Sequence, residues 1–263
     1  MTLEYADIGG CRVAYRFDGP AGAPVVVLSN SLSSNLSMWD DQMAALTAKF
    51  RVLRYDQRGH GQSEATPGPY SFDMLADDVR GLLESLGIDS VHFVGLSMGG
   101  MTGMNLAVRH PEILKSLALC DTSAHMPPPD MWDDRIALAR KEGMAATSEP
   151  TLGRWFTVPF HAARPDAIER VRQMIESTPV EGYAGCCMAI RDMDQLEAIS
   201  GIAVPTRVIV GAEDPSTPVA ASQAIHERIA GSDLVIVGDA AHLSNIEQTD
   251  VFNAALLDFL SRN

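Results

Sequence analysis

The chain has 263 residues, of which 46% are hydrophobic and 21% are charged, and its net charge is −14. This length and balance predict one soluble domain, with room for an insertion and with a core that needs no disulfides. The strong negative charge argues against nucleic acid or an anionic membrane as a partner.

Cysteine spacing and the N-terminal residues bear on the compartment. Cys11, Cys120, Cys186 and Cys187 show no metal-ligand spacing, so we expect reduced thiols. The segment Met1–Tyr5 has neither the basic region nor the apolar core of a signal peptide. No apolar stretch is long enough to span a bilayer. These features predict a cytoplasmic protein that binds no metal and no membrane.

Apolar runs alternate with helical patterns along most of the chain. A hairpin that turns at Gly9-Gly10 is expected first, with strands over 2–8 and 11–17. The later strands are expected over 24–28, 51–55, 91–94, 116–120, 206–210 and 234–237. The helices that accompany them are expected over 39–48, 72–86, 100–109, 218–230 and 246–261. This alternation predicts an α/β fold, with a mostly parallel sheet covered by helices on both faces.

Residues 125–204 interrupt the alternation, because they contain no convincing strand. Helical patterns broken by prolines are present instead, near 130–142, 166–176 and 182–193. A helical insertion between two parallel strands is expected to form a cap over the carboxyl ends of the strands, where ligands bind. The alternative is a helical excursion that packs on the flank. We therefore expect a core of residues 1–124 and 205–263 with a cap of residues 125–204.

The stretch Gly95–Gly99 reads Gly-Leu-Ser-Met-Gly and lies between an expected strand and an expected helix. Glycines two residues before and after the serine relieve crowding in a sharp strand-to-helix turn. Such a turn holds a serine hydroxyl above the edge of the sheet, which makes Ser97 a candidate nucleophile. An ordinary turn between strand and helix is the alternative, since glycine and serine are common turn residues.

A serine nucleophile needs a base that is oriented by an acid. His242 follows the last expected strand, at the same edge of the sheet as Ser97, and is the candidate base. Asp214 follows the strand 206–210 and is the candidate acid, while Asp121, after strand 116–120, is its rival. The remaining histidines fit structural or surface positions better: His60, His92, His110, His125, His161 and His226.

Two backbone N–H groups are needed to stabilise the tetrahedral oxyanion. Met98 follows the nucleophile and supplies one of them. Leu32, in the polar loop Ser29–Ser34, is the candidate for the other, unless this loop is only a turn. The glycine-rich loop Asp56–Ser63 is interpreted as architectural, because its Asp and Arg can join adjacent loops by charge-assisted hydrogen bonds.

These motifs resemble those of the α/β-hydrolase superfamily over nearly the whole chain, including the order Ser97, Asp214, His242. More specific stretches resemble 3-oxoadipate enol-lactone hydrolases of the β-ketoadipate pathway. These stretches are Ser29–Leu32 with Met38–Asp40, Gly99–Met101 with Leu119–Ser123, and Arg154–Thr157. The resemblance implies an α/β-hydrolase fold with an eight-stranded, mostly parallel sheet, a helical cap, and cofactor-free opening of the enol-lactone to 3-oxoadipate. Asn30-Ser31 replaces the usual His-Gly, and Ser33 stands where glycine is more usual.

A small anionic lactone requires a local cation in a strongly acidic protein. Arg154 is the first candidate for this cation, with Trp155 as a flat wall for the ring. A solvated arginine and a core tryptophan are the alternative. Two other functions stay open: another carboxylesterase, lactonase or carbon–carbon bond hydrolase on the same triad, and a non-catalytic ligand-binding protein with this fold.

Overall fold

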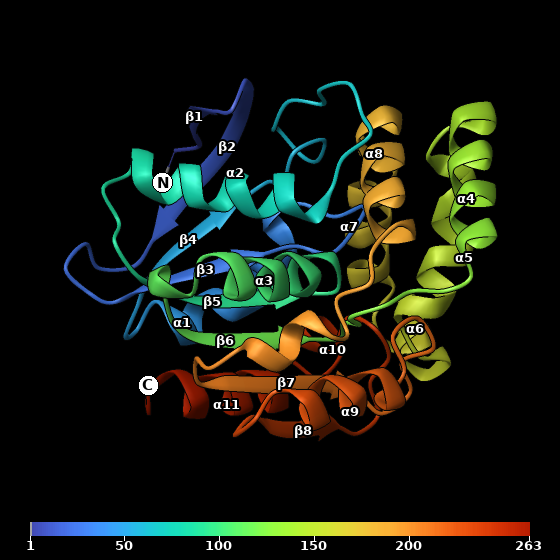
Figure 1. Cartoon of the computed structure of the whole chain (residues 1–263). Coiled ribbons are helices and arrows are strands. Elements are labelled where there is room, and N and C mark those ends of the chain that lie inside the picture. The colour runs from blue at the N-terminus through green and yellow to red at the C-terminus, as the bar shows by residue number, and fades with distance from the viewer. Residues whose placement is uncertain (1) are drawn as a thin grey trace.

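A computed structural model describes residues 2–263 and contains one sheet of eight strands, in the order β1-β2-β4-β3-β5-β6-β7-β8 (Figure 1). The hairpin β1–β2 is antiparallel, and β2 pairs antiparallel with β4. All other neighbours are parallel. The eight-stranded, mostly parallel sheet predicted from the sequence is therefore confirmed.

The boundaries of most core elements lie close to those expected. The strands are β1 (Glu4–Ile8), β2 (Cys11–Asp18), β3 (Val25–Ser29), β4 (Arg51–Tyr55), β5 (Val91–Leu96), β6 (Leu114–Cys120), β7 (Thr206–Gly211) and β8 (Asp233–Val237). The helices of the same core are η1 (Leu36–Gln42), α1 (Met43–Leu46), α2 (Phe72–Ser85), α3 (Met98–Arg109), η2 (Pro111–Ile113), α9 (Val219–Arg228), α10 (Ser244–Glu247) and α11 (Thr249–Leu260).

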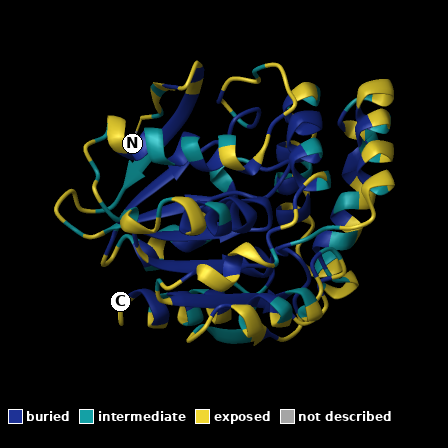
Figure 2. Ribbon diagram, viewed as in Figure 1, coloured by how far each residue is buried: buried dark blue, intermediate teal, exposed yellow. Residues whose placement is uncertain are grey.

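Helices cover both faces of the sheet. The helices α2 and α3 pack together over one face, while η1, α1 and α11 contact one another on the other (Figure 1). Every residue of the central strand β5 and of β7 is buried, as continuous apolar runs in parallel strands require. Figure 2 shows the central strands as buried, with exposed residues on the outer sides of helices and in loops. The loops that follow β5 and β7 therefore begin at strands that are fully buried in the core.

Two expected core helices are each observed as two helices, and the helix expected over 246–261 is divided into α10 and α11. The single helix expected over 39–48 begins earlier, as the 3₁₀ helix η1, and continues as the short helix α1. Asn35 caps η1, since its side chain accepts a hydrogen bond from the Ser37 N–H (3.0 Å). The cap sets the start of the helix, and the periodicity of apolar residues gave no sign of it.

The insertion between β6 and β7 contains the short 3₁₀ helix η3 (Ala198–Gly201) and five α-helices, which lie together at one end of the sheet (Figure 1). They are α4 (Pro129–Glu142), α5 (Ala145–Trp155), α6 (Val158–Ala163), α7 (Pro165–Glu176) and α8 (Val180–Arg191). The sequence predicted α4, α7 and α8 but not α5 and α6. Proline was interpreted there as a helix breaker, whereas Pro150 lies inside α5 and Pro159 lies in the first turn of α6, where its missing N–H costs nothing.

The described residues, 2–263, include no helix with the length and apolar character needed to cross a membrane. The division into residues 1–124 and 205–263 as core and 125–204 as cap remains a proposal.

Candidate active site

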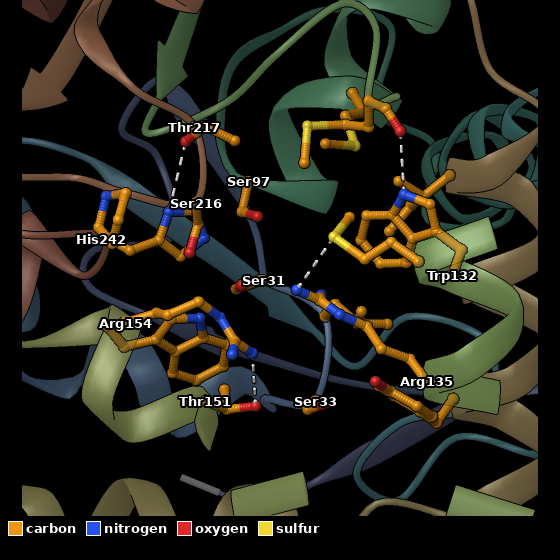
Figure 3. Close-up of a pocket in the computed structure, with 18 residues that line it drawn as sticks. Ser31, Ser33, Ser97, Trp132, Arg135, Thr151, Arg154, Ser216, Thr217 and His242 are labelled. Carbon is orange, nitrogen blue, oxygen red and sulfur yellow. Dashed lines mark hydrogen bonds between the residues drawn. The ribbon is translucent and has the colours of Figure 1, made fainter. Parts of the chain in front are cut away.

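Ser97 stands at the sharp turn between β5 and α3. Its φ is +55°, in a region that residues with side chains rarely adopt. Glycines make the turn possible, because a Cβ on Gly95 would overlap the Gly99 carbonyl and a Cβ on Gly99 would overlap the Ser29 carbonyl. The Ser97 N–H donates to the Cys120 carbonyl (2.8 Å), which ties the turn to the neighbouring strand. Backbone contacts thus hold Ser97 in place, and its side chain lines the cavity (Figure 3).

His242 and Asp214 come from the loops after β8 and β7 and meet at the same edge of the sheet. Nδ1 of His242 lies 2.8 Å from Oδ2 of Asp214. The N–H groups of Ser216 and Thr217 donate to Oδ1 of Asp214 (2.7 and 3.1 Å), and the Thr217 hydroxyl donates to Oδ2 (2.7 Å). Burial raises the pKa of Asp214, but the His242 ring and the bonds from Thr217 outweigh burial, so the pKa lies below its usual value.

An ionised Asp214 favours the tautomer of His242 that carries its proton on Nδ1, which leaves Nε2 free as a base. His242 and Ser97 line the same cavity. Within residues 2–263, no hydrogen bond joins the Ser97 hydroxyl to His242. Contacts of this kind tighten when the substrate binds.

Asp121, the rival acid, does not contact His242 but supports the loops on either side of the pair. It is fully buried, and it accepts hydrogen bonds from the Gly211 N–H (2.8 Å) and the Ser244 hydroxyl (2.6 Å). Burial and then the negative charge of Asp214 raise the pKa of Asp121 well above its usual value. Asp121 therefore joins the loops through Gly211 and Ser244, and among the described residues it makes no hydrogen bond to His242.

The backbone N–H groups of Leu32 and Met98 are the candidate oxyanion donors. In the described part of the chain neither amide donates to a protein acceptor. Met98 opens α3, where the helix dipole adds positive potential. Leu32 is followed by Ser33, which adopts a φ of +61° and donates its N–H to Nε2 of His60 (3.0 Å). The serine therefore adopts the backbone shape that a glycine would favour, with a histidine holding it there.

A cavity of about 160 Å³ connects these groups (Figure 3). Both sequence-predicted substrate residues, Arg154 and Trp155 of α5, line it together with Ser97 and His242. Arg135 of α4 lines it too. A volume of this size admits a small organic acid or lactone.

The two cavity arginines have no carboxylate partners in the described part of the chain. Arg154 donates only to the Thr151 hydroxyl (3.3 Å), and the guanidinium of Arg135 lies 4.6 Å from the centre of the Trp132 ring. Burial and then the positive charge of Arg135 lower the pKa of Arg154. The chain has a net charge of −14, but the two guanidinium groups make the electrostatic potential inside this cavity locally positive.

The helical insertion is fastened to the loop that carries His242. The Leu243 N–H donates to the Trp155 carbonyl (3.1 Å). Glu247 accepts from the N–H and the hydroxyl of Thr157 (3.0 and 2.5 Å) with one oxygen and from the Ala241 N–H (2.8 Å) with the other. These bonds join the end of α5 to both sides of the base candidate.

A family model described as alpha/beta hydrolase fold matches residues 24–249, which is most of the chain. The chain belongs to the α/β-hydrolase family. A 3-oxoadipate enol-lactonase from Acinetobacter baylyi is 38% identical, over 99% of this chain and 96% of the relative. The solved enol-lactonase of Burkholderia xenovorans is 44% identical, with a TM-score of 0.96, covering 98% of this chain and 100% of that chain. A thermophilic esterase from Thermogutta terrifontis, solved with malate, is 29% identical, with a TM-score of 0.91, and covers 100% of this chain and 99% of that chain. The resemblance inferred from the motifs is confirmed.

Some residues that support this α/β-hydrolase site were not predicted from the sequence. Thr217 holds Asp214, and its signal was the stretch Asp-Pro-Ser-Thr, in which an Asp side chain often bonds the amides that follow it. The contacts of Glu247 and His60 join segments far apart in the chain, so no local pattern announced them.

Proposed function

We propose that this hydrolase opens 3-oxoadipate enol-lactone to 3-oxoadipate, with Ser97, Asp214 and His242 as its catalytic triad. The names and high coverage of the two enol-lactonase relatives support the reaction. The observation that carries the proposal is the meeting, in one small cavity, of a serine elbow, an Asp–His pair and two unpaired arginines. This combination suits a substrate with a reactive carbonyl at one end and a carboxylate at the other.

In the proposed mechanism, His242 accepts the Ser97 proton at Nε2 while Oγ attacks the lactone carbonyl. The N–H groups of Leu32 and Met98 stabilise the negative oxygen that forms. The tetrahedral intermediate collapses with cleavage of the ring C–O bond. The released enolate oxygen takes the proton from His242 and the enol tautomerises to the ketone, so both ends remain in one acyl-enzyme. Water then attacks the acyl carbonyl while His242 takes its proton. Cleavage of the ester bond to Ser97 releases 3-oxoadipate, and His242 returns the proton to Oγ.

The residues 125–204 act as the cap in this proposal and supply the anchor for the substrate carboxylate. Arg154 is the primary anchor, Arg135 reinforces it from the neighbouring helix, and Trp155 forms a wall. A carboxylate between two guanidinium groups gains charge-assisted hydrogen bonds and relieves the repulsion between the two cations.

Replacing Arg154 by leucine is expected to lower kcat/KM for the enol-lactone, because a charge-assisted hydrogen bond is lost. The fall corresponds to a loss of about 1–3 kcal/mol of transition-state stabilisation. Hydrolysis of a neutral aryl ester should barely change, since its acyl group carries no charge to pair. Steady-state kinetics with both substrates measure the difference. Arg135→Leu is expected to lower kcat/KM for the lactone by a smaller factor. In the double variant the two free-energy losses should not add, because both guanidinium groups bind the same carboxylate.

Arg191 offers a matched control. It also lies in the helical insertion, but it is paired with Asp133 and Asp192 (both 2.7 Å) and does not line the cavity. Arg191→Leu should leave both reactions within about twofold of wild type, as expected for a surface ion pair. If Arg154→Leu and Arg191→Leu behave alike toward the lactone, the anchor lies elsewhere.

The deciding experiment is product analysis with synthetic enol-lactone, in parallel with short aryl esters. The esterase relative makes simple ester hydrolysis the second candidate function. Turnover of the lactone to 3-oxoadipate at a kcat/KM well above that of the esters supports the proposal. Faster ester turnover would favour the second candidate, and binding without turnover of either substrate would favour a ligand-binding protein.

A further inference from the structure

The glycine-rich loop Asp56–Ser63 has no part in the mechanism above, yet it makes several bonds to the loop that carries Leu32. Oδ1 of Asp56 accepts the Leu36 N–H (2.7 Å). The side-chain amide of Gln57 donates to the Asn30 carbonyl (2.6 Å). Near the middle of the segment, Nε2 of His60 accepts the Ser33 N–H (3.0 Å). The oxyanion loop is thus shaped against a second loop about 25 residues further along the chain.

These bonds bracket the donor. The Leu32 N–H belongs to the peptide between Ser31 and Leu32. Gln57 holds the carbonyl of Asn30 on one side of this peptide, and His60 holds the N–H of Ser33 on the other side. Because Ser33 has a positive φ, which a serine adopts only under constraint, release of its N–H would let the backbone relax. A rotation of the preceding peptide would then move the Leu32 N–H away from the oxyanion.

The same loop reaches the second donor. The Thr102 hydroxyl lies 3.3 Å from Oε1 of Gln57 and 3.0 Å from the carbonyl of Met98, inside α3. Gln57 therefore contacts both elements that supply oxyanion donors. The Leu32 and Met98 amides follow different strands, and the contacts of Gln57 connect the two segments that carry them.

We propose that His60 is a positioning residue for the oxyanion hole, and that its Nε2 holds the Leu32–Ser33 backbone in the geometry that stabilises the transition state. This inference rests on the serine-hydrolase mechanism proposed above. His60 touches neither the substrate nor the reacting atoms, because it is buried behind the loop and does not line the cavity.

The chemistry of the ring fits this role. Nδ1 lies 3.3 Å from the Arg58 carbonyl, so it carries the proton and leaves Nε2 as an acceptor. Burial lowers the pKa of His60 to about 4, so the ring is neutral at physiological pH and can accept the Ser33 N–H.

The test compares His60→Leu, which removes the acceptor, with His60→Gln, which keeps a carbonyl oxygen near the position of Nε2. His92→Leu is the matched control. His92 is also buried and bonded through one ring nitrogen to a side chain, the Ser116 hydroxyl (2.9 Å), but it lies at the start of β5, away from the cavity. The substrate is 4-nitrophenyl acetate, and the transition-state mimic is benzeneboronic acid, which forms a tetrahedral adduct with a serine nucleophile.

For His60→Leu we expect kcat to fall about 10- to 100-fold, somewhat less than the loss of a whole oxyanion donor. KM should stay within about threefold, because the substrate ground state makes little use of the hole. The affinity for the boronic acid should fall by the same factor as kcat. His60→Gln should recover much of the loss, and His92→Leu should stay within about twofold of wild type.

An unchanged kcat in folded His60→Leu, an unchanged boronic acid affinity, or an equal loss in His92→Leu would overturn the proposal. If His60→Leu does not fold, His60→Gln and the ¹⁵N spectrum of the wild-type imidazole still decide. A proton on Nε2 of His60 contradicts the assignment. Failure of the wild-type chain to hydrolyse either lactone or ester would instead count against the proposed function, so the two failures are distinguishable.

Discussion

Replacing Ser97 by alanine is expected to lower kcat for the enol-lactone by about 10⁴-fold or more, with the fold unchanged. The hydroxyl is the proposed nucleophile, and it makes no hydrogen bond to another described side chain, so its removal breaks no structural contact. Alanine also occupies the same strained backbone at no greater steric cost than serine. Loss of lactone absorbance measures kcat, and thermal unfolding confirms that the variant is folded. A folded variant that keeps more than about a tenth of the wild-type kcat would reject Ser97 as the nucleophile.

The residual rate of this variant is informative. The oxyanion donors and the arginines remain in place, so Ser97→Ala should still exceed the uncatalysed rate, as other triads do without their nucleophile. It should also retain affinity for the substrate carboxylate, which makes it the form suited to measuring lactone binding without turnover.

The second large effect concerns the two buried carboxyl groups near His242. Asp214→Asn is expected to reduce kcat on the order of 10⁴-fold, because the amide favours the wrong tautomer of His242 and does not stabilise the imidazolium. Asp121→Asn should be mild. Burial and the charge of Asp214 raise the pKa of Asp121, which makes no hydrogen bond to His242 among the described residues, and an asparagine oxygen can still accept the Gly211 N–H.

The two variants control for each other, since both replace a buried carboxyl by an amide of the same shape. Parallel measurements of kcat and of the unfolding temperature separate a catalytic role from a structural one. A severe loss of kcat in Asp121→Asn together with a mild loss in Asp214→Asn would identify Asp121, in the loop after β6, as the acid.

The three members of the proposed triad could be selected from the sequence because each follows an apolar strand that is easy to recognise. In a mostly parallel sheet, all such positions lie at one edge, so strand ends far apart in the chain become neighbours. The choice between Asp214 and Asp121 was harder, since both follow strands. Only the contacts of His242, and the separate bonds of Asp121, distinguish them.

The helical insertion was the least predictable part. Its helices follow no sheet that would fix their order or direction, and Pro150 and Pro159 concealed α5 and α6. Whether Arg135 or Arg191 faced the cavity depended on how α4 and α8 pack, which periodicity does not determine. The role proposed for His60 depends on a contact 27 residues away in the chain, and a single sequence carries no signal for such a contact.

The bonds of Glu247 also limit how a ligand can come and go. Because three hydrogen bonds join Trp155 and Thr157 to Leu243 and Glu247, this corner of the helical insertion is not expected to move outward unless the segment that carries His242 moves with it. Traffic of substrate and product is therefore expected on the opposite side of the cavity, where Met131 and Trp132 of α4 form the wall. The side of the cavity that is fastened to the His242 loop therefore carries Arg154 and Trp155 of α5, while the opposite side carries Arg135 of α4 (Figure 3).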